Sequence, residues 1–378
     1  MITLRENSTT GAVTELTAPQ LAFLRSCPLV SVRAAGSGYR LVPRPRQVGA
    51  VHAHGLDVVV SPKVSIPRLL FMIGYANNPR FLPENVEGVS ASGLWAIVAE
   101  TLCRNAERAL AGGVLQGYTT TSSASTVLRG RIRVGDQITR RPGRSLPVEI
   151  THDEYTVDIP ENRTLRAAIR RMRTVPRLSP LLLARLRHLD NRLPDVSPVV
   201  SPWRPNRLNA RYQPALRIAD LVLDTMSFEV GASGLSIASF VVNMDRVFEA
   251  FVTTALREAW SSFPGRTVDQ FRTSLDEDGS LAMRPDVVHL VDGRPRFVVD
   301  AKYKLESPNT DHYQVLAYCT ALQVTSAWLV YASGTGSVRR RRVRNSPITI
   351  TEYPLRLDVP PADLLAQISD LAHSAWAS

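Results

Sequence analysis

The chain is long and strongly basic, with 378 residues, a formal net charge of +11 and a pI near 10.0. A hydrophobic content of 44% with 21% charged residues excludes a disordered chain and favours two or three globular domains. No apolar run approaches the roughly 18 residues of a membrane helix, and Met1–Thr9 lacks a signal-peptide pattern, so we expect cytoplasmic residence.

The basic residues are almost all arginine. Of the 45 basic residues, the only lysines are Lys63, Lys302 and Lys304. Because arginine cannot readily lose its proton or act as a compact point charge, a retained lysine indicates a site that needs an ammonium group. No lysine follows a glycine, so the sequence has no phosphate-binding P-loop, and any nucleotide-driven motor must be another chain. The excess positive charge favours nucleic acid as a partner.

The cysteines carry little functional information. They lie far apart, without paired spacing, at Cys27, Cys103 and Cys319. Such spacing suggests neither a disulfide framework nor a zinc site, and it predicts buried thiols.

Residues 1–147 are expected to form a mixed α/β domain. The pattern predicts strands and turns over the first 80 residues, with these clearer elements: a helix at Ala18–Ser26, a strand at Leu56–Val60, a helix starting within Arg68–Tyr75 and a helix at Leu94–Ala111. Tyr118–Ser125 is a loop or weak strand, and Val127–Val134 is basic and extended. The turn-rich Arg140–Pro147 marks the best candidate for a domain boundary.

Residues 148–234 form a helical, arginine-rich middle segment. Helices are predicted at Glu161–Arg173, from Pro180–Arg187 and at Ala215–Met226. The first helix is apolar on one face and dense in arginine on the other. That basic face is either simply solvated or a contact surface for DNA or a partner.

Residues 235–378 form the third domain, which opens with a well-formed amphipathic helix at Met244–Trp260. Glu249 lies at the edge of its apolar stripe. This carboxylate is either an ordinary boundary residue or a third acidic group that reaches a nearby site.

The next segment, Arg284–Lys304, predicts a β-hairpin. Two apolar runs, Val287–Val291 and Phe297–Ala301, flank Asp292-Gly293, a strong hairpin signal. A hairpin centred on Gly293 places Asp286 directly opposite Asp300.

Lys302, two residues after Asp300, then points to the same face. A carboxylate pair binds hard divalent cations such as Mg²⁺ or Mn²⁺. The lysine would orient or deprotonate water, or stabilise charge on a phosphate. The alternative is an ordinary surface hairpin, because the bare pattern also occurs by chance.

The remaining elements complete an α/β core. They are a helix starting at Ser307-Pro308, a buried strand at Ala327–Ala332, a strand at Ile348–Tyr353 and a C-terminal helix at Ala362–Trp376. Asp311, Gln314 and Tyr318 are expected on one face of the first of these helices, opposite Val315, Leu316 and Cys319. The run Arg339, Arg340, Arg341 and Arg342 is either a solvated edge strand or a clamp on the DNA backbone.

The Pro-Asp … Asp-x-Lys pattern resembles the PD-(D/E)xK superfamily of metal-dependent nucleases, and the chain as a whole resembles the McrC family of nuclease subunits. The resemblance rests on Val48-Gly49, Ser61-Pro62-Lys63, Leu128-Arg129-Gly130-Arg131, Asn162-Arg163-Thr164-Leu165, Met244 to Glu249, Arg284-Pro285-Asp286, Asp300-Ala301-Lys302-Tyr303-Lys304, and Asp311 through Gln314 to Tyr318. It implies a restriction-endonuclease-like core at the C-terminal end. It also implies an McrB-like AAA+ GTPase ring as partner, which the N-terminal part docks into and stimulates.

The resemblance also implies roles for individual residues. Asp286 and Asp300 would bind Mg²⁺, for which Mn²⁺ substitutes, with help from the Ala301 carbonyl and Glu249. Lys302 would position the attacking water, and Gln314 and Tyr318 would orient the DNA strand. The candidate DNA-binding residues are Arg284, Lys304, Arg339, Arg340, Arg341 and Arg342.

Three functions remain open. The first is an Mg²⁺-dependent endonuclease subunit for modified double-stranded DNA. The second is a non-catalytic adaptor that binds DNA and stimulates a partner NTPase, and the third is a stand-alone repair nuclease. The intact Asp286, Asp300 and Lys302 favour an enzyme, and the large portion outside the nuclease core favours a subunit over a solitary nuclease.

Overall fold

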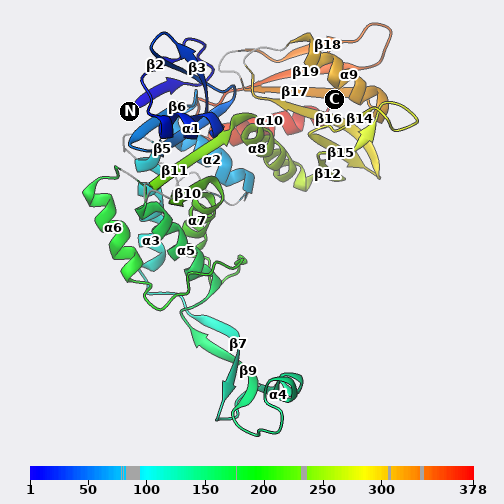
Figure 1. Ribbon diagram of the computed structural model, residues 1–378. Coiled ribbons are helices and arrows are strands. Elements are labelled where there is room, and N and C mark those ends of the chain that lie inside the picture. Colours follow the sequence, from blue (N-terminus) through cyan, green and yellow to red (C-terminus); the bar gives the residue numbers. More distant parts are fainter. Residues whose placement is uncertain are drawn as a thin grey trace. The chain divides into compact units, whose positions relative to one another are not determined.

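The computed structural model has the predicted α/β composition (Figure 1). It describes residues 1–77, 79, 81, 94–175, 177–230, 236–304, 308–332 and 336–378. The chain packs as two compact units, of which unit 1 comprises residues 1–97 and 225–378 and unit 2 comprises residues 98–224. None of the helices in these described ranges is both long and apolar enough to cross a membrane.

The boundaries expected from the sequence do not coincide with the edges of these units. The predicted boundary between residues 147 and 148 falls inside unit 2. The predicted boundary between residues 234 and 235 begins the third domain at Leu235, which lies outside the described residues. The three-part domain division therefore stays a prediction.

Unit 1 contains a five-stranded sheet built from both ends of the unit. Its order is β1 (Ile2–Arg5), β6 (Leu56–Ser61), β5 (Gln47–Ala53), β11 (Ser236–Asn243) and β10 (Met226–Val230). β1 is parallel to β6, and the other pairs are antiparallel. At Gly49 on β5, φ is +143° and a Cβ would lie 1.8 Å from the carbonyl oxygen of Phe240 on β11. Only glycine lets these two strands approach.

A smaller sheet covers the N-terminal strands. It has the order β2 (Ala12–Thr14), β4 (Gly38–Pro43) and β3 (Val30–Ala35), and α1 (Ala18–Ser26) precedes β3. α1 begins where the Gln20 side chain accepts a 3.0 Å hydrogen bond from the amide of Thr17. Leu24, Leu29 and Val60 form one buried apolar cluster, so both sheets share a core.

The C-terminal part of unit 1 is a six-stranded mixed sheet. Its order is β12 (Arg266–Asp269), β15 (Val287–Val291), β16 (Arg294–Lys302), β17 (Ser326–Ala332), β19 (Thr349–Leu355) and β18 (Arg339–Arg342). The central pairs β16–β17 and β17–β19 are parallel. β17 is buried along its whole length, as expected for a central strand covered on both faces. A separate two-stranded pair joins β13 (Thr273–Ser274) to β14 (Ala282–Met283).

Helices cover both faces of the six-stranded sheet. On one face, Val315 and Cys319 of α9 (Asn309–Leu322) share a core with Val298 and Leu329. On the other face lie α8 (Met244–Ala259), the short 3₁₀ helix η2 (Trp260–Ser262) and α10 (Pro361–Trp376). There the Trp260 ring lies 5.0 Å from Phe297, and its indole nitrogen donates to the Ala372 carbonyl at 3.0 Å. The opposite face of α8 packs on α2 (Ile66–Asn77), where Phe71 contacts Phe251 edge-on.

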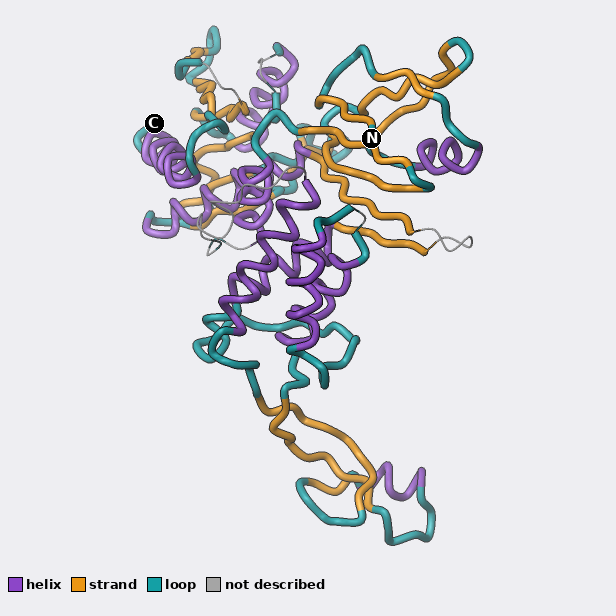
Figure 2. Tube along the Cα trace, turned by 90° about the vertical axis from the view of Figure 1, so that its left-hand side faces the viewer, coloured by secondary structure: helices purple, strands orange, loops and turns teal. Residues whose placement is uncertain are grey.

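Unit 2 combines helices with a long β-ribbon. The helices are α3 (Leu94–Leu110), whose first residues belong to unit 1, α5 (Pro160–Arg173), α6 (Pro180–Asn191) and α7 (Gln213–Thr225). The ribbon pairs β7 (Gly117–Ser125) with β9 (Val148–Thr156), and β8 (Arg131–Ile132) and α4 (Val134–Arg140) lie between them in the chain. Figure 2 shows the two long strands of the ribbon side by side. β7 has no fully buried residue, so no second layer of the described residues covers it.

The basic face of the middle helices is largely engaged within unit 2. Arg166, Arg170 and Arg173 all bind the buried carboxylate of Asp190. Arg185 binds two glutamates of α3. These arginines stabilise helix packing, which reduces the charge left on this face for DNA or a partner.

Most predicted helices are confirmed, including those at Ala18–Ser26 and Met244–Trp260. The extended prediction for Val127–Val134 holds only at β8, because Val134 begins α4. α4 buries none of its side chains, so it lacks the apolar period that marks a helix in a sequence. The helix predicted from Ser307-Pro308 begins at Asn309, and Ser307 lies outside the described residues. The three cysteines are free and buried as predicted.

Candidate functional site

The hairpin β15–β16 brings the two predicted aspartates to one end. Its turn, Asp292-Gly293, has positive φ at both residues, 51° and 77°, as a two-residue hairpin turn requires. This turn pairs Val291 with Arg294, but the register shifts by one between His289 and Leu290, so Val287 pairs with Val299.

This shift decides which side chains meet. Without it, Asp286 would oppose Val299 and the two carboxylates would point to opposite faces. With it, continuing the register one residue beyond the Val287–Val299 pair places Asp286 opposite Asp300. The arrangement expected from a centre at Gly293 is therefore present, and it depends on a bulge that the sequence pattern did not show.

Asp300 and Lys302 form a close pair on β16. The Nζ atom of Lys302 lies 2.6 Å from Oδ2 of Asp300, whose side chain is only 1% exposed. Burial, followed by repulsion from Asp286, raises the pKa of Asp300 to about 7. Burial opposes the charge of Lys302, but the two aspartates outweigh it and raise the pKa of Lys302. Lys302 is therefore an ammonium in this state, suited to stabilising negative charge rather than removing a proton.

Asp286 is buried beside the backbone of β16. Its Oδ2 atom accepts a hydrogen bond from the amide of Ala301 at 2.9 Å. Burial and the nearby Glu249 raise the pKa of Asp286 to about 6. Burial is also the main cause of the raised pKa of Glu249, to which Asp300 adds repulsion. Three carboxylates from two elements thus influence one another at this site.

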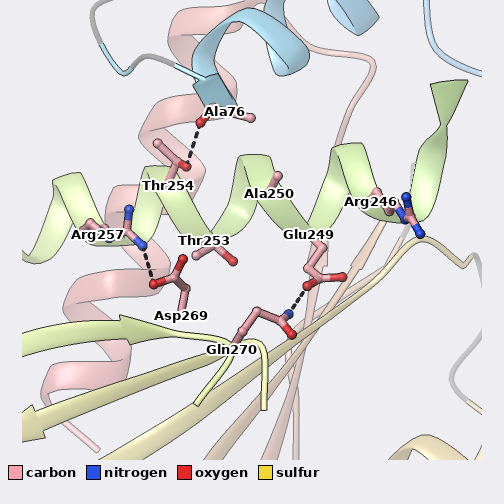
Figure 3. Close-up of a pocket in the computed structure, with 9 residues that line it drawn as sticks. All are labelled: Ala76, Arg246, Glu249, Ala250, Thr253, Thr254, Arg257, Asp269 and Gln270. Atoms are coloured by element: carbon pink, nitrogen blue, oxygen red, sulfur yellow. Dashed lines mark hydrogen bonds and ion pairs between the residues drawn. The ribbon is translucent and has the colours of Figure 1, made fainter. Parts of the chain in front are cut away.

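Gln270, which follows β12, is a site residue that the sequence reading missed. Its amide nitrogen donates to Oε1 of Glu249 and, at 3.2 Å, to Oδ1 of Asp286. Figure 3 shows Glu249 projecting from α8 toward Gln270. No periodic pattern marks Gln270 in the sequence, because it lies in a connection and acts on residues of other elements.

Glu249 and Gln270 also line a pocket of about 310 Å³ along the exposed side of α8. Its remaining lining residues are Ala76, Arg246, Ala250, Thr253, Thr254, Arg257 and Asp269 (Figure 3). Arg257 binds Asp269 across this pocket at 2.9 Å. The pocket gives solvent and small ions access to the Glu249 side of the acidic site.

Helix α9 places its predicted residues in different environments. Tyr318 is buried with Val315 and Cys319, rather than opposite them as expected. Burial and the charges of Asp300 and Asp286 raise the pKa of Tyr318, and a hydrogen bond with the exposed Gln314 opposes this. Tyr318 therefore faces the acidic site from within the core.

The predicted DNA-binding residues are dispersed. Arg284 is exposed and acts electrostatically on Glu249, so it lies at the site. Lys304 instead binds both carboxylate oxygens of Asp311, at 2.9 and 3.1 Å.

The arginine run forms the exposed edge strand β18. Across the sheet, Asp300 on β16 pairs with Leu329 on β17, Leu329 pairs with Glu352 on β19, and Glu352 pairs with Arg339 on β18. Paired residues of neighbouring strands point to the same face of the sheet. Three strand spacings separate β16 from β18, which is about 14 Å. Arg339 therefore lies on the same face as Asp300, whereas Arg340 lies on the other face. Arg341 binds Glu352, which also accepts from His312 at 2.7 Å.

The donor set suits a hard cation only in part. No group of three or more His, Cys, Asp or Glu side chains among the described residues is arranged to hold a metal ion. Asp286 and Asp300 supply two buried carboxylates, and among the described residues the only partner of Asp300 Oδ2 is the ammonium of Lys302. Two carboxylates, a neighbouring carbonyl and water are a ligand set that Mg²⁺ accepts.

The fold and the site define an α/β protein with a buried acidic pair and a lysine on one hairpin. The chain belongs to the family described as McrBC 5-methylcytosine restriction system component, whose family model matches residues 45–332. No curated protein matches the sequence.

Two solved structures are similar to this chain. One is a chain of the refined half-complex from a tetradecameric assembly of Thermococcus gammatolerans McrB AAA+ hexamers with bound McrC, with a TM-score of 0.62 and 14% identity over 99% of both chains. At this identity the likeness shows a shared fold. The other is a chain of the cryo-EM structure of the Thermococcus gammatolerans McrBC complex, with a TM-score of 0.43 and 16% identity over 70% of this chain and 89% of that chain.

Proposed function

We propose that this protein is the DNA endonuclease subunit of an McrBC-like restriction system that acts on modified DNA together with a AAA+ GTPase. The observation that carries the proposal is the convergence of Asp286, Asp300 and Lys302 at the end of one hairpin, in a chain of the McrBC family. Paired carboxylates with a neighbouring ammonium are the groups that metal-assisted phosphodiester hydrolysis uses.

Asp286 and Asp300 would hold the cation, with the Ala301 carbonyl and Glu249 as further ligands. A bound Mg²⁺ or Mn²⁺ supplies Lewis-acid activation of water and of the phosphate. Asp286, Asp300 and Glu249 are not arranged as a ready-made metal-binding group among the described residues, so the cation would keep several of its waters, as Mg²⁺ usually does.

The other residues of the site act on the DNA. The Lys302 ammonium stabilises the charge that develops on the phosphate, because its pKa is raised and it stays protonated. Gln314, exposed and bonded to Tyr318, orients the strand beside the carboxylates. Arg284 contacts the DNA backbone at the entrance, next to Glu249.

A AAA+ partner is supported by the shared fold with a chain from the McrB hexamer assembly and by the missing P-loop. The β7–β9 ribbon and its tip, which is the segment 126–147 between the two strands, supply a docking surface. Its exposed large apolar side chains are Tyr118, Val127, Leu128, Ile132, Val134, Ile138, Leu146 and Tyr155. An exposed apolar concentration of this kind marks a protein interaction site.

The decisive experiment is cleavage of methylated and unmethylated plasmid with Mg²⁺, with and without the partner GTPase and GTP. Wild type should cut only with the partner, and Asp300→Asn and Lys302→Ala should abolish cutting. Asp278→Asn, which changes an exposed aspartate outside the site, is the matched control and should cut normally. Equal cutting by Asp300→Asn and wild type would exclude the assigned site.

One observation favours a second function, a non-catalytic adaptor that stimulates its partner. The ammonium of Lys302 already pairs with the carboxylate of Asp300, which would compete with a cation. Among the described residues, no three side chains are arranged to hold a metal ion. In that case, no variant or condition cuts DNA, while the chain still stimulates GTP hydrolysis by the partner. The plasmid assay with a parallel GTPase assay distinguishes the two functions.

A further inference from the structure

Gln270 joins two acidic side chains of different elements. Its amide nitrogen donates to Asp286 on the hairpin, at 3.2 Å, and to Glu249 on α8. Ionised carboxylates only accept hydrogen bonds, so the NH₂ group of the amide must face them. A neutral donor between two like charges offsets their repulsion and keeps them close.

The backbone fixes Gln270 at this place. Its amide donates to the carbonyl of Asp286 at 2.8 Å, and the next amide, of Phe271, donates to the carbonyl of Pro285 at 3.1 Å. The φ angle of Gln270 is +47°, in the left-handed region that non-glycine residues rarely adopt. Such strained residues concentrate at functional sites. Gln270 is therefore attached directly to the Pro-Asp part of the motif.

The Glu249 side of the site is open to small ions. Glu249 and Gln270 form part of the wall of the 310 Å³ pocket along α8. This volume exceeds that of a single water, roughly 30 Å³, by about tenfold, so a hydrated cation fits. Glu249 is only half-buried, and its side chain is held at the site by the hydrogen bond from Gln270 and by its direct interaction with Asp286.

We propose that Gln270 is a positioning residue, which holds the Glu249 carboxylate beside Asp286 so that both face one cation. This inference rests on the proposed nuclease function and deepens it. Gln270 need not touch the cation or the DNA. It acts mainly through Glu249, because the Ala301 amide already fixes the other carboxylate, of Asp286, at 2.9 Å. Removing Glu249 should therefore also remove the effect of Gln270.

The test is Mn²⁺ and Mg²⁺ binding to the full chain without DNA, measured by titration calorimetry. Gln270→Leu keeps the size of the side chain and removes both donors, so it should weaken binding about tenfold. Glu249→Gln should weaken binding to a similar degree. The double variant should bind no more weakly than Glu249→Gln alone, since coupled residues are not additive. Thr253→Val, a change in the same pocket at a residue outside the proposed cation site, should leave binding unchanged.

Gln270→Asn guards against a folding defect in the leucine variant. Asparagine tolerates the left-handed conformation but is one methylene shorter, so it should fold normally and still weaken cation binding. Binding as tight as wild type in Gln270→Asn and Gln270→Leu, or effects of Gln270→Leu and Glu249→Gln that add fully, would overturn the inference. Asp300→Asn in the same titration tests the site itself: unchanged binding there rejects the proposed cation site, whatever Gln270 does.

Discussion

The hydroxyl of Tyr303 donates a 3.1 Å hydrogen bond to Oε2 of Glu6. Tyr303 lies between Lys302 and Lys304, directly after β16, and Glu6 directly follows the first strand of the chain. Both residues are buried, and the same Glu6 oxygen accepts from the amide of Lys63. The N-terminal sheet is thus bonded to the strand that carries the candidate catalytic residues.

Tyr303→Phe should destabilise unit 1. It removes a donor from a buried carboxylate, and a hydrogen bond to a charged group contributes about 1.5–3 kcal/mol. We expect the free energy of unfolding to fall by roughly that amount in urea denaturation. Tyr353→Phe is the control, because that hydroxyl donates to a neutral carbonyl, of Gln367, at 2.9 Å. Equal losses in both variants would show that the Glu6 carboxylate adds nothing.

The titration of Asp300 should lower the stability of the metal-free protein as pH rises from about 4 to 7. Burial raises the pKa of Asp300 from 3.8 to about 7 in the folded state. Between these values the folded chain binds a proton that the unfolded chain lacks, so the free energy of unfolding falls with pH. Each pKa unit corresponds to about 1.4 kcal/mol.

Asp300→Asn removes this titration, and the comparison cancels other groups that titrate over the same range. The stability of Asp300→Asn relative to wild type, both in chelator, should improve by about 2–4 kcal/mol from pH 4 to pH 7. If the free energies of unfolding of wild type and Asp300→Asn changed with pH in parallel, the raised pKa of Asp300 would be contradicted. Mg²⁺ should stabilise wild type at pH 7, because a ligand that binds only the folded state adds to its stability.

The sequence predicted the elements of the site better than their connections. Local sequence patterns predicted the apolar stripe of α8, the Asp-Gly turn and the two apolar runs of the hairpin. The structure has these elements at the predicted places. The register bulge between His289 and Leu290 has no such signal, although it decides that Asp286 and Asp300 share a face. Asp286 and Asp300 were expected on one face only because the hairpin was assumed to be centred on Gly293.

Long-range partners could not be read from the sequence. Gln270 acts on Glu249 and Asp286 from a connection, and Glu6 reaches Tyr303 from the opposite end of the chain. These contacts depend on how strands are ordered in the two sheets, which periodicity does not encode. Likewise, charge alone did not show that Lys304 is already bound to Asp311.

Lys302→Arg should lose cleavage although it keeps the charge. The side chain of Lys302 is only 20% exposed and lies against Asp300, where a planar guanidinium cannot replace a compact ammonium. We expect single-turnover cleavage to fall by about 10²- to 10³-fold, as for loss of one transition-state donor. Lys63→Arg, a change at an exposed lysine, should cut as wild type does. A fully active Lys302→Arg would show that only net charge matters at this position.

Arg339→Ala should weaken DNA binding more than Arg340→Ala. Both side chains are exposed on β18, but only Arg339 shares the sheet face of Asp300. Loss of one phosphate contact should lower the slope of log K against log salt by about 0.9. Arg341→Ala should have a smaller effect, because Glu352 already pairs with Arg341. Fluorescence anisotropy over a salt series measures these slopes, and equal effects of Arg339→Ala and Arg340→Ala would reject the face assignment.

Leu128→Asp and Ile138→Asp should abolish stimulation of the partner GTPase. These side chains are 62% and 67% exposed on the β7–β9 ribbon and its tip, so the substitutions should leave the fold intact. At an interface, however, each replaces favourable apolar burial, about 25 cal/mol per Å², by the cost of desolvating a carboxylate. Leu208→Asp changes a side chain that is 83% exposed in the same unit but outside the ribbon, and it is the matched control. GTP hydrolysis at increasing concentrations of each variant measures docking. If Leu208→Asp alone fails to stimulate, the docking surface lies elsewhere in unit 2, and the ribbon has another role.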